Sequence, residues 1–240
     1  MGHRSGDVQH GDNKIRRGEY SEVEYLQFSA GQKFRTVRAL LGALTWPLIW
    51  PLAMLARRSE FLFRTMSELL SVIPYLIGVI TRYEFYRFAL RHCGKNVLIE
   101  FGAIFIYPDV SIGNNVLIGR YSIVHHCDFG DYVLTGERCT FLSGSRQHSY
   151  DRTDMPMALQ GGKKKRIMIG DDCWIGSHAV VMNDVGAGAI VGAGTVVLKP
   201  VANLAIVAGN PAREVGRRGE RGQESARVRI EHHLIALHEK

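Results

Sequence analysis

The chain has 240 residues, of which 46% are hydrophobic and 22% are charged, and its net charge is +7. This composition excludes an intrinsically disordered chain, and 26 glycines against 7 prolines exclude collagen-like or proline-rich sequence. The positive charge favours anionic partners, but it does not distinguish nucleic acid, lipid headgroups and phosphorylated ligands.

Residues 1–30 are polar and mixed in charge and are predicted to be mobile, whereas residues 31–93 are predicted to be helical. The uncharged stretch Ala39–Ala56 just reaches the length of a membrane-spanning helix. However, Pro47 and Pro51 each remove a backbone donor from its interior, and basic residues flank it on both sides. We therefore expect a re-entrant or interfacial hairpin in preference to a span. The alternative is a helical hairpin buried in a soluble domain.

A second apolar stretch, Leu69–Ile80, is too short to cross a bilayer. It leads into residues 81–94, where aromatic residues alternate with arginines. Such a segment suits the lipid–water boundary, and it equally suits a helix that caps a protein core. We expect contact with a membrane surface through residues 39–91.

From residue 94 to residue 215 the sequence shows a six-residue repeat in which an apolar residue is commonly followed by glycine. The repeated positions are Ile112, Ile118, Val124, Phe129, Thr135, Phe141, Ile169, Ile175, Val185, Val191 and Val197. Each hexad fits a short strand and a turn, and three hexads make one triangular coil of about eighteen residues whose apolar side chains point inward. Because one coil cannot bury its own core, we predict a mainly β fold of about five stacked coils with one long loop at residues 143–166.

The segments IGDDCWIGSHAVV, VGAGAIVGAGTVVLKPV and AIVAGNPAREV, between Ile169 and Val215, closely resemble the hexapeptide-repeat acyltransferases. The resemblance covers roughly residues 64–216 and implies a left-handed parallel β-helix that works as a homotrimer. The upstream segments ELLSVIPYLIG and FYRFALRHCGKNV are similar to the subgroup that O-acetylates sugars of bacterial surface polysaccharides. One departure is the spacing from Ile175 to Val185, which is two residues short of the family's twelve and predicts a shortened corner near Met182–Asp184.

The long loop contains the sequence His148-Ser149-Tyr150-Asp151, and a histidine at this place is the general base of the resembling acetyltransferases. Attack of a sugar hydroxyl on a thioester requires removal of the hydroxyl proton, which imidazole performs well near neutral pH. The resemblance therefore implies that His148 is catalytic and that Tyr150 and Asp151 lie on the acceptor side. The alternative for His148 is a solvated loop histidine.

Three further residues are candidates for the acceptor side of the site. His125 and His126 either line the acceptor cleft from a neighbouring chain or lie at the surface or an interface, and Trp174 either lines the cleft near the thioester or packs on the coil. His178 is left unassigned. Zinc-dependent carbonic anhydrases of this fold carry a second histidine five residues after the loop histidine, but this chain has Thr153 there. No metal is expected, and the four cysteines, which lack CxxC spacing, are expected to be reduced and mostly buried.

The resemblance also implies that acetyl-CoA, as co-substrate, lies along a groove between adjacent subunits. The candidate cofactor-binding residues are Gly176, Ser177, Ala193, Gly194, Lys199 and Arg213. Small residues would let pantetheine approach the coils, and the two cations suit phosphate oxygens or are ordinary surface cations. The run Lys163–Arg166 is either a solvated charge run or an attractant for a phosphorylated or lipid-linked acceptor. No nucleic-acid-binding module is recognisable, so no nucleic-acid partner is expected.

Together these features predict an acetyl-CoA-dependent O-acetyltransferase. Its acceptor would be a sugar hydroxyl of a surface polysaccharide, a lipopolysaccharide or a lipid-linked glycan. The alternatives are an N-acetyltransferase and a non-catalytic β-helix scaffold. The expected location is the cytoplasm, peripheral or monotopic at the inner face of the bacterial cytoplasmic membrane. In the tail, residues 216–240, a short amphipathic helix is expected from Val228 to Leu237.

Overall fold

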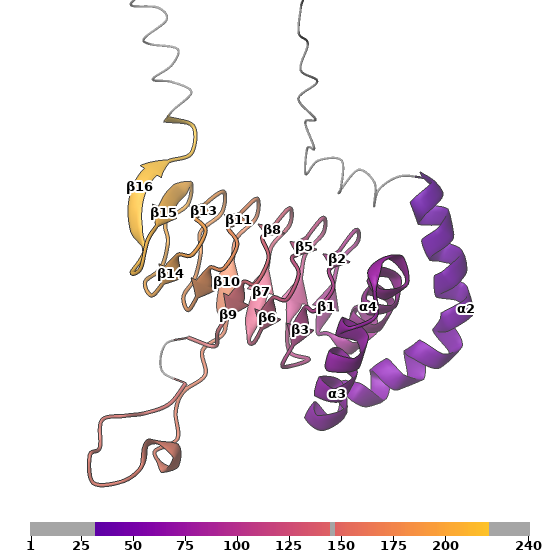
Figure 1. Cartoon of the computed structure of the whole chain (residues 1–240), viewed down its shortest axis with the longest axis horizontal. Coiled ribbons are helices and arrows are strands. Elements are labelled where there is room, and N and C mark those ends of the chain that lie inside the picture. Colours follow the sequence, from indigo (N-terminus) through magenta and orange to yellow (C-terminus); the bar gives the residue numbers. More distant parts are fainter. Residues whose placement is uncertain (1–31, 145–146, 221–240) are drawn as a thin grey trace, which may run out of the picture.

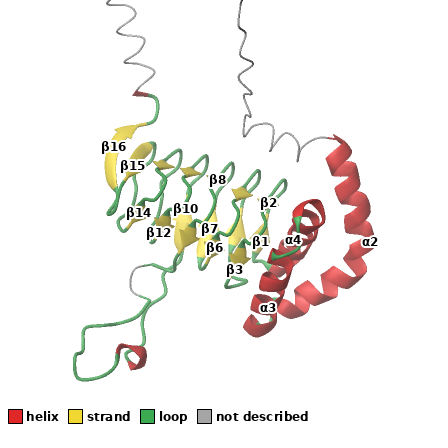
Figure 2. Cartoon of the chain, viewed as in Figure 1, coloured by secondary structure: helices red, strands yellow, loops and turns green. Residues whose placement is uncertain are grey.

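The computed structural model describes residues 32–144 and 147–220 (Figure 1). Three helices, α2 (Gln32–Ala56), α3 (Glu60–Ser71) and α4 (Tyr75–Ala89), gather at one end of a prism of short strands. The long loop, which contains the single turn η1 (Met157–Leu159), leaves the side of the prism (Figure 2). The predicted helix from Val228 to Leu237 and the predicted mobile residues 1–30 lie outside the described residues.

The prism has three walls, which we call sheets A, B and C. Sheet A contains β1 (His92–Cys93), β4 (Ser111–Ile112), β7 (Cys127–Phe129) and β10 (Ile167–Ile169). Sheet B contains β2 (Leu98–Ile99), β5 (Leu117–Ile118), β8 (Leu134–Thr135), β11 (Trp174–Ile175), β13 (Ile190–Val191), β15 (Ala205–Ala208) and β16 (Arg213–Arg217). Sheet C contains β3 (Ile104–Phe105), β6 (Ile123–Val124), β9 (Thr140–Phe141), β12 (Val180–Val181) and β14 (Val196–Val197).

Neighbouring strands of each sheet come from successive coils and run parallel, except for the final antiparallel pair β15–β16. The register places each repeated apolar residue over its equivalent, as in Ile99 beside Ile118 and Val181 beside Val197. All eleven repeated positions are buried, and the most exposed of them, Phe129, is only 4% exposed. The predicted stacked-coil, mainly β fold is confirmed, and it is consistent with a left-handed β-helix. Its last strand continues two residues beyond residue 215.

The predicted short corner lies between β12 and the next sheet A position. Val185 bridges Ile169 on one side and Val201 on the other, so sheet A continues although the chain reaches Val185 only four residues after Val181. Polar side chains close this corner, because Asn183 Nδ2 donates to the Leu198 carbonyl at 3.1 Å and Asp184 Oδ1 accepts from Met168 N at 3.0 Å. Since β11 and β12 keep their register with the following coil, the shortening stays local.

Helix α4 covers the open end of the first coil. Its aromatic residues Tyr83, Phe85 and Tyr86 are buried against Phe63 and Phe105, so these rings do not face a membrane. The expectation of a lipid-facing aromatic segment is therefore wrong for these rings. The end coil of a β-helix exposes apolar residues, and burying these rings against it removes both surfaces from water.

One buried cation, Arg82, joins the cap to the prism. Its Nε donates to the Ile99 carbonyl at 2.8 Å, and its Nη1 donates to the carbonyls of Leu70 and Ile73, both at 2.9 Å. The Ile99 carbonyl belongs to β2 in the prism, and the other two belong to the end of α3 and to the turn that follows it in the cap. A fully buried guanidinium thus satisfies backbone groups from both elements.

Helix α2 is one continuous helix from Gln32 to Ala56, so the expected hairpin within Ala39–Ala56 is wrong. Both Pro47 and Pro51 lie inside it, and the helix is visibly curved (Figure 1). Proline removes one backbone hydrogen bond and bends a helix, but a helix can continue past it where neighbouring turns hold it in place. Among the described residues, no helix has the length and apolar character that crossing a bilayer requires.

The cysteine thiols are expected to be inert in the folded protein. All four are free, and burial raises the pKa of Cys139 to about 11 and that of Cys93 to about 12. Burial also raises the pKa of Cys127 and of Cys173. We predict that Ellman's reagent at pH 8 labels no thiol until urea is added, and rapid labelling of native protein would contradict this. Because unfolded thiols ionise at lower pH, the free energy of unfolding should fall as pH rises above about 9.

Candidate functional site

The edge where sheet B turns into sheet C forms a column of small residues. We call this edge the B–C edge. Gly176 and Ser177 follow β11, Ala193 and Gly194 occupy the next coil, and Gly194 N donates to the Ser177 carbonyl at 2.9 Å. Ala193 and Gly194 are exposed, and a Cβ at Gly194 would meet no atom within 4 Å. The structure thus brings the four predicted small residues together on one edge, where Ala193 and Gly194 are open, Ser177 is half-buried and Gly176 is buried beneath Ala193.

Trp174 stands beside this edge on β11. Its side chain is 49% exposed and points outward from sheet B, in register with Leu134 and Ile190 of the neighbouring coils. The inward neighbour Ile175 fills the core instead. Trp174 is therefore free to line a groove along the outside of the prism.

The two predicted phosphate-binding cations lie near the last coil. Lys199 and Arg213 are both exposed, and Arg213 begins β16. Ala212 N donates to the Val196 carbonyl at 2.9 Å, which fastens the segment before Arg213 onto β14. A CoA whose pantetheine followed the B–C edge would have its nucleotide at this end, so the residues present fit the predicted co-substrate.

The predicted catalytic loop leaves the prism between β9 and β10, at the edge where sheet C turns into sheet A. It projects away from the body on the side opposite the upper turns of the coils (Figure 1). His148, Tyr150 and Asp151 are exposed, and Ser149 N donates to the Gly161 carbonyl at 2.9 Å, which holds the two arms of the loop together. Within the described parts of one protomer, no hydrogen bond, ion pair or ring contact joins His148 to Trp174 or to the B–C edge.

His125 and His126 lie where this loop returns to the prism. The His126 ring stacks on Tyr107 with centroids 4.0 Å apart, and Lys164 Nζ donates to the Tyr107 hydroxyl at 2.7 Å. Burial lowers the pKa of both imidazoles, and positive neighbours lower it further, His126 for His125 and Arg166 for His126. Sequence reasoning missed Tyr107, because its partners come from other coils.

The basic run at the end of the loop is bound to the prism. Arg166 pairs with Asp109 and Asp128, and Lys165 Nζ donates to Asp184 at 2.9 Å. Together with Lys164 on Tyr107, three of the four cations are engaged. Lys164 and Lys165 stay exposed, as a solvated charge run predicts, but these three cations also have partners that are distant in sequence and become neighbours only when the coils stack.

Comparisons with known proteins place the chain in a family. A family model described as the hexapeptide repeat of succinyl-transferase matches residues 166–199. A chloramphenicol acetyltransferase from Klebsiella aerogenes is 30% identical over 131 residues, which cover 48% of this chain and 58% of that protein. A probable macrolide acetyltransferase from Lysinibacillus sphaericus is 30% identical over 120 residues, which cover 40% of this chain and 67% of that protein. The chain belongs to the hexapeptide-repeat acetyltransferases.

A solved structure shares the fold. The maltose O-acetyltransferase from Clostridium difficile 630 superposes with a TM-score of 0.57 at 20% identity, over 65% of this chain and 84% of that chain. At this identity the likeness establishes the fold alone. This hexapeptide-repeat acetyltransferase spans little more than half the length of the Klebsiella relative, so its substrate is argued from its own residues.

Proposed function

We propose that the protein is an acetyl-CoA-dependent O-acetyltransferase that acts on a sugar hydroxyl of a surface polysaccharide, a lipopolysaccharide or a lipid-linked glycan. The observation that supports this most is the B–C edge, where exposed small residues and an outward tryptophan adjoin each other in a chain of this family. The subgroup resemblance at residues 68–97 supports the sugar acceptor.

In the proposed reaction, His148 takes the proton from the acceptor hydroxyl as its oxygen attacks the thioester carbonyl. Backbone N–H groups or a small polar side chain stabilise the tetrahedral oxyanion, and its collapse expels the CoA thiolate. Transfer is direct, without an acyl-enzyme. A cysteine nucleophile would need a lowered pKa, whereas burial raises the pKa of all four thiols of this chain.

We propose that the working unit is a homotrimer. Two walls of the prism carry mainly apolar outward ladders, whereas the third wall presents Ser111 and Asp128 beside a single apolar residue, Met168. The outward residues are Leu117, Leu134, Trp174, Ile190 and Ile206 on sheet B, Ile104, Ile123, Thr140, Val180 and Val196 on sheet C, and Ser111, Asp128 and Met168 on sheet A. Apolar walls favour contact with other copies, and the projecting loop then supplies His148 to the B–C edge of a neighbour.

Purified protein tests this function directly. Acetyl-CoA labelled in its acetyl group is incubated with glycan extracted from a strain that lacks the gene, and label in the glycan is counted. We expect label that mild alkali releases, because an O-acetyl ester is alkali-labile. Label resistant to alkali would support the N-acetyltransferase alternative, and a protein that neither transfers acetyl groups nor binds CoA would support the scaffold alternative.

We also propose that α2 rests on the inner face of the cytoplasmic membrane. Among the α2 residues from Leu40 onward whose side chains are described, the exposed ones are all apolar: Leu40, Ala43, Pro47, Leu48, Trp50, Pro51 and Leu55. The exposed Arg57 and Arg58 follow it, and cations beside an apolar face favour an anionic bilayer surface.

Vesicle flotation tests this membrane contact. The protein is expected to float with phosphatidylglycerol vesicles, and Leu48→Glu combined with Leu55→Glu is expected to abolish flotation because it places charges in the apolar face. Leu204→Glu, an exposed leucine at the far end of the prism, is the matched control and should still float. A wild-type protein that stays with the unbound fraction would contradict the proposal.

A further inference from the structure

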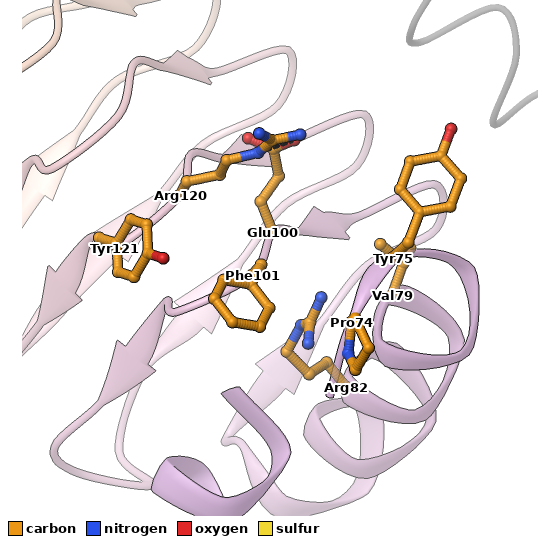
Figure 3. A pocket seen from close by; sticks show the side chains of 8 residues that line it. All are labelled: Pro74, Tyr75, Val79, Arg82, Glu100, Phe101, Arg120 and Tyr121. Carbon is orange, nitrogen blue, oxygen red and sulfur yellow. Dashed lines mark ion pairs between the residues drawn. The ribbon is translucent and has the colours of Figure 1, made fainter. Parts of the chain in front are cut away.

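A cavity of about 310 Å³ lies where α4 meets the first two coils (Figure 3). Pro74, Tyr75 and Val79 line it from the start of α4, and Glu100, Phe101, Arg120 and Tyr121 line it from the turns that follow β2 and β5. Its volume lies at the lower end of the range for small-molecule sites, and it holds the space of a monosaccharide unit.

This cavity lies at the first two coils of the same B–C edge that carries the proposed cofactor residues in later coils. Backbone hydrogen bonds stack the edge coil by coil: His178 N donates to the Glu137 carbonyl at 2.8 Å, Arg138 N to the Arg120 carbonyl at 2.7 Å, and Tyr121 N to the Phe101 carbonyl at 3.0 Å. Since stacked strands are about 4.8 Å apart, Tyr121 lies about 10 Å along the prism from Ser177. A molecule that presents a hydroxyl near Ser177 can therefore reach the cavity with its next unit.

The walls of the cavity differ in chemistry. Figure 3 shows Pro74 and Val79 on the helix side, with the Phe101 ring across from them and the Tyr121 hydroxyl directed toward the space between. Arg120 and Glu100 form an ion pair above it, with Nε and Oε1 3.6 Å apart. The Arg82 guanidinium also lines the cavity, but it donates to the carbonyls of Ile99, Leu70 and Ile73. Apolar walls beside a hydroxyl, an ion pair and a guanidinium already bonded to the backbone suit a neutral ring with an apolar face and a rim of hydroxyls.

Tyr121 occupies a position that the coil itself does not favour for tyrosine. Its φ is 57°, in the left-handed region, and the equivalent turns of the B–C edge carry Gly102, Arg138, His178 and Gly194 there. Left-handed backbone costs a residue with a Cβ about 1–2 kcal/mol, and asparagine or glycine suits it best. The ring also lies over Gly102, where a Cβ would come within 2.4 Å of it, so the turn below is shaped to hold the ring. Arg138 and His178 share this backbone conformation, so it is the ring packed over Gly102 that makes Tyr121 a candidate for function.

We infer that this cavity, which we call the α4 cavity, binds a neutral sugar unit of the acceptor next to the unit that is acetylated. This inference rests on the proposed function. The glycan then runs along the B–C edge, with its reacting hydroxyl near Ser177 and its neighbouring unit against Phe101 and Tyr121. Tyr121 acts here as a specificity residue that holds the acceptor, and it takes no part in the proton transfer.

The test uses purified full-length protein and, as acceptor, the glycan extracted from the gene-deleted strain. Tyr121→Ala is expected to lower kcat/KM for the glycan about tenfold, mainly through KM, because it removes binding away from the reacting atoms. Tyr121→Phe, which keeps the ring and loses one hydroxyl, is expected to lower it about threefold. The Kd for CoA and the melting temperature should remain those of the wild type.

Tyr132 provides the matched control, because it has a φ of 58° and is 60% exposed, against 57° and 50% for Tyr121, but it lies on a different edge of the prism. Tyr132→Ala should leave kcat/KM unchanged. If the wild type transfers acetyl groups and Tyr121→Ala matches it, the α4 cavity does not bind the acceptor. If the wild type transfers nothing, the proposed function itself fails. If Tyr132→Ala is as impaired as Tyr121→Ala, the loss belongs to the turn and the inference is overturned.

Discussion

Replacement of His148 by alanine is expected to lower kcat for acetyl transfer about 10²- to 10⁴-fold, the usual contribution of a positioned general base. The Kd for CoA should not change, because within one protomer the loop leaves the prism at the edge between sheets C and A, whereas the small residues lie on the B–C edge. His92→Ala, which removes an exposed imidazole from sheet A, is the control and should keep full activity. A His148→Ala protein with the wild-type rate would refute the proposed mechanism.

A mixing experiment shows which copy supplies this histidine. His148→Ala and a groove-blocked Ala193→Trp protein are each expected to be inactive. Chains co-expressed in equal amounts should regain about a quarter of the activity if the base and the groove come from different copies of a closed ring. No recovery in mixed oligomers would show that both groups belong to one chain.

The second large effect is expected at Arg82. Arg82→Ala removes the charge-assisted hydrogen bonds to the carbonyls of Leu70, Ser71, Ile73 and Ile99 and leaves these groups without this donor. Because hydrogen bonds to charged groups contribute about 1.5–3 kcal/mol each, the free energy of unfolding should fall by at least about 3 kcal/mol. Urea unfolding followed by circular dichroism measures this change.

Arg64→Ala is the control for this measurement. Arg64 is exposed on α3, and its removal should change the free energy of unfolding by no more than about 0.5 kcal/mol. Equal effects of the two substitutions would mean that the buried guanidinium does not fasten α4 and α3 to the first coil.

The prism could be predicted from sequence because its signal is local and repeated. A residue such as Ile118 or Val191 points inward because of its position in its own hexad, and every stacked coil repeats that position. The shortened corner near Asn183 could be predicted for the same reason. The hairpin within Ala39–Ala56 was predicted wrongly. Pro47 and Pro51 destabilise the helix locally, but their presence in the sequence does not determine whether the helix ends or bends.

The parts of the site that could not be predicted depend on contacts between distant segments. Lys164 and Arg166 looked like solvated cations until stacking brought Tyr107 and Asp109 beside them. The α4 cavity is made by a helix and two separate turns, and its one local signal is Tyr121 in a turn position that favours asparagine or glycine. In the proposed homotrimer, the position of His148 relative to the acceptor would be set by another copy of the chain, which no spacing within one sequence encodes.

The most direct measurement of the central claim is a calorimetric titration with CoA of two variants that differ in one respect. The chain carries two Gly-Ala-Gly turns in successive corners, with Ala187 on the edge between sheets A and B and Ala193 on the B–C edge, and both alanines are exposed. We expect Ala193→Trp to abolish CoA binding by filling the groove and Ala187→Trp to bind CoA like the wild type. Binding that survives Ala193→Trp, or that is lost only in Ala187→Trp, would contradict the placement of the cofactor on the B–C edge.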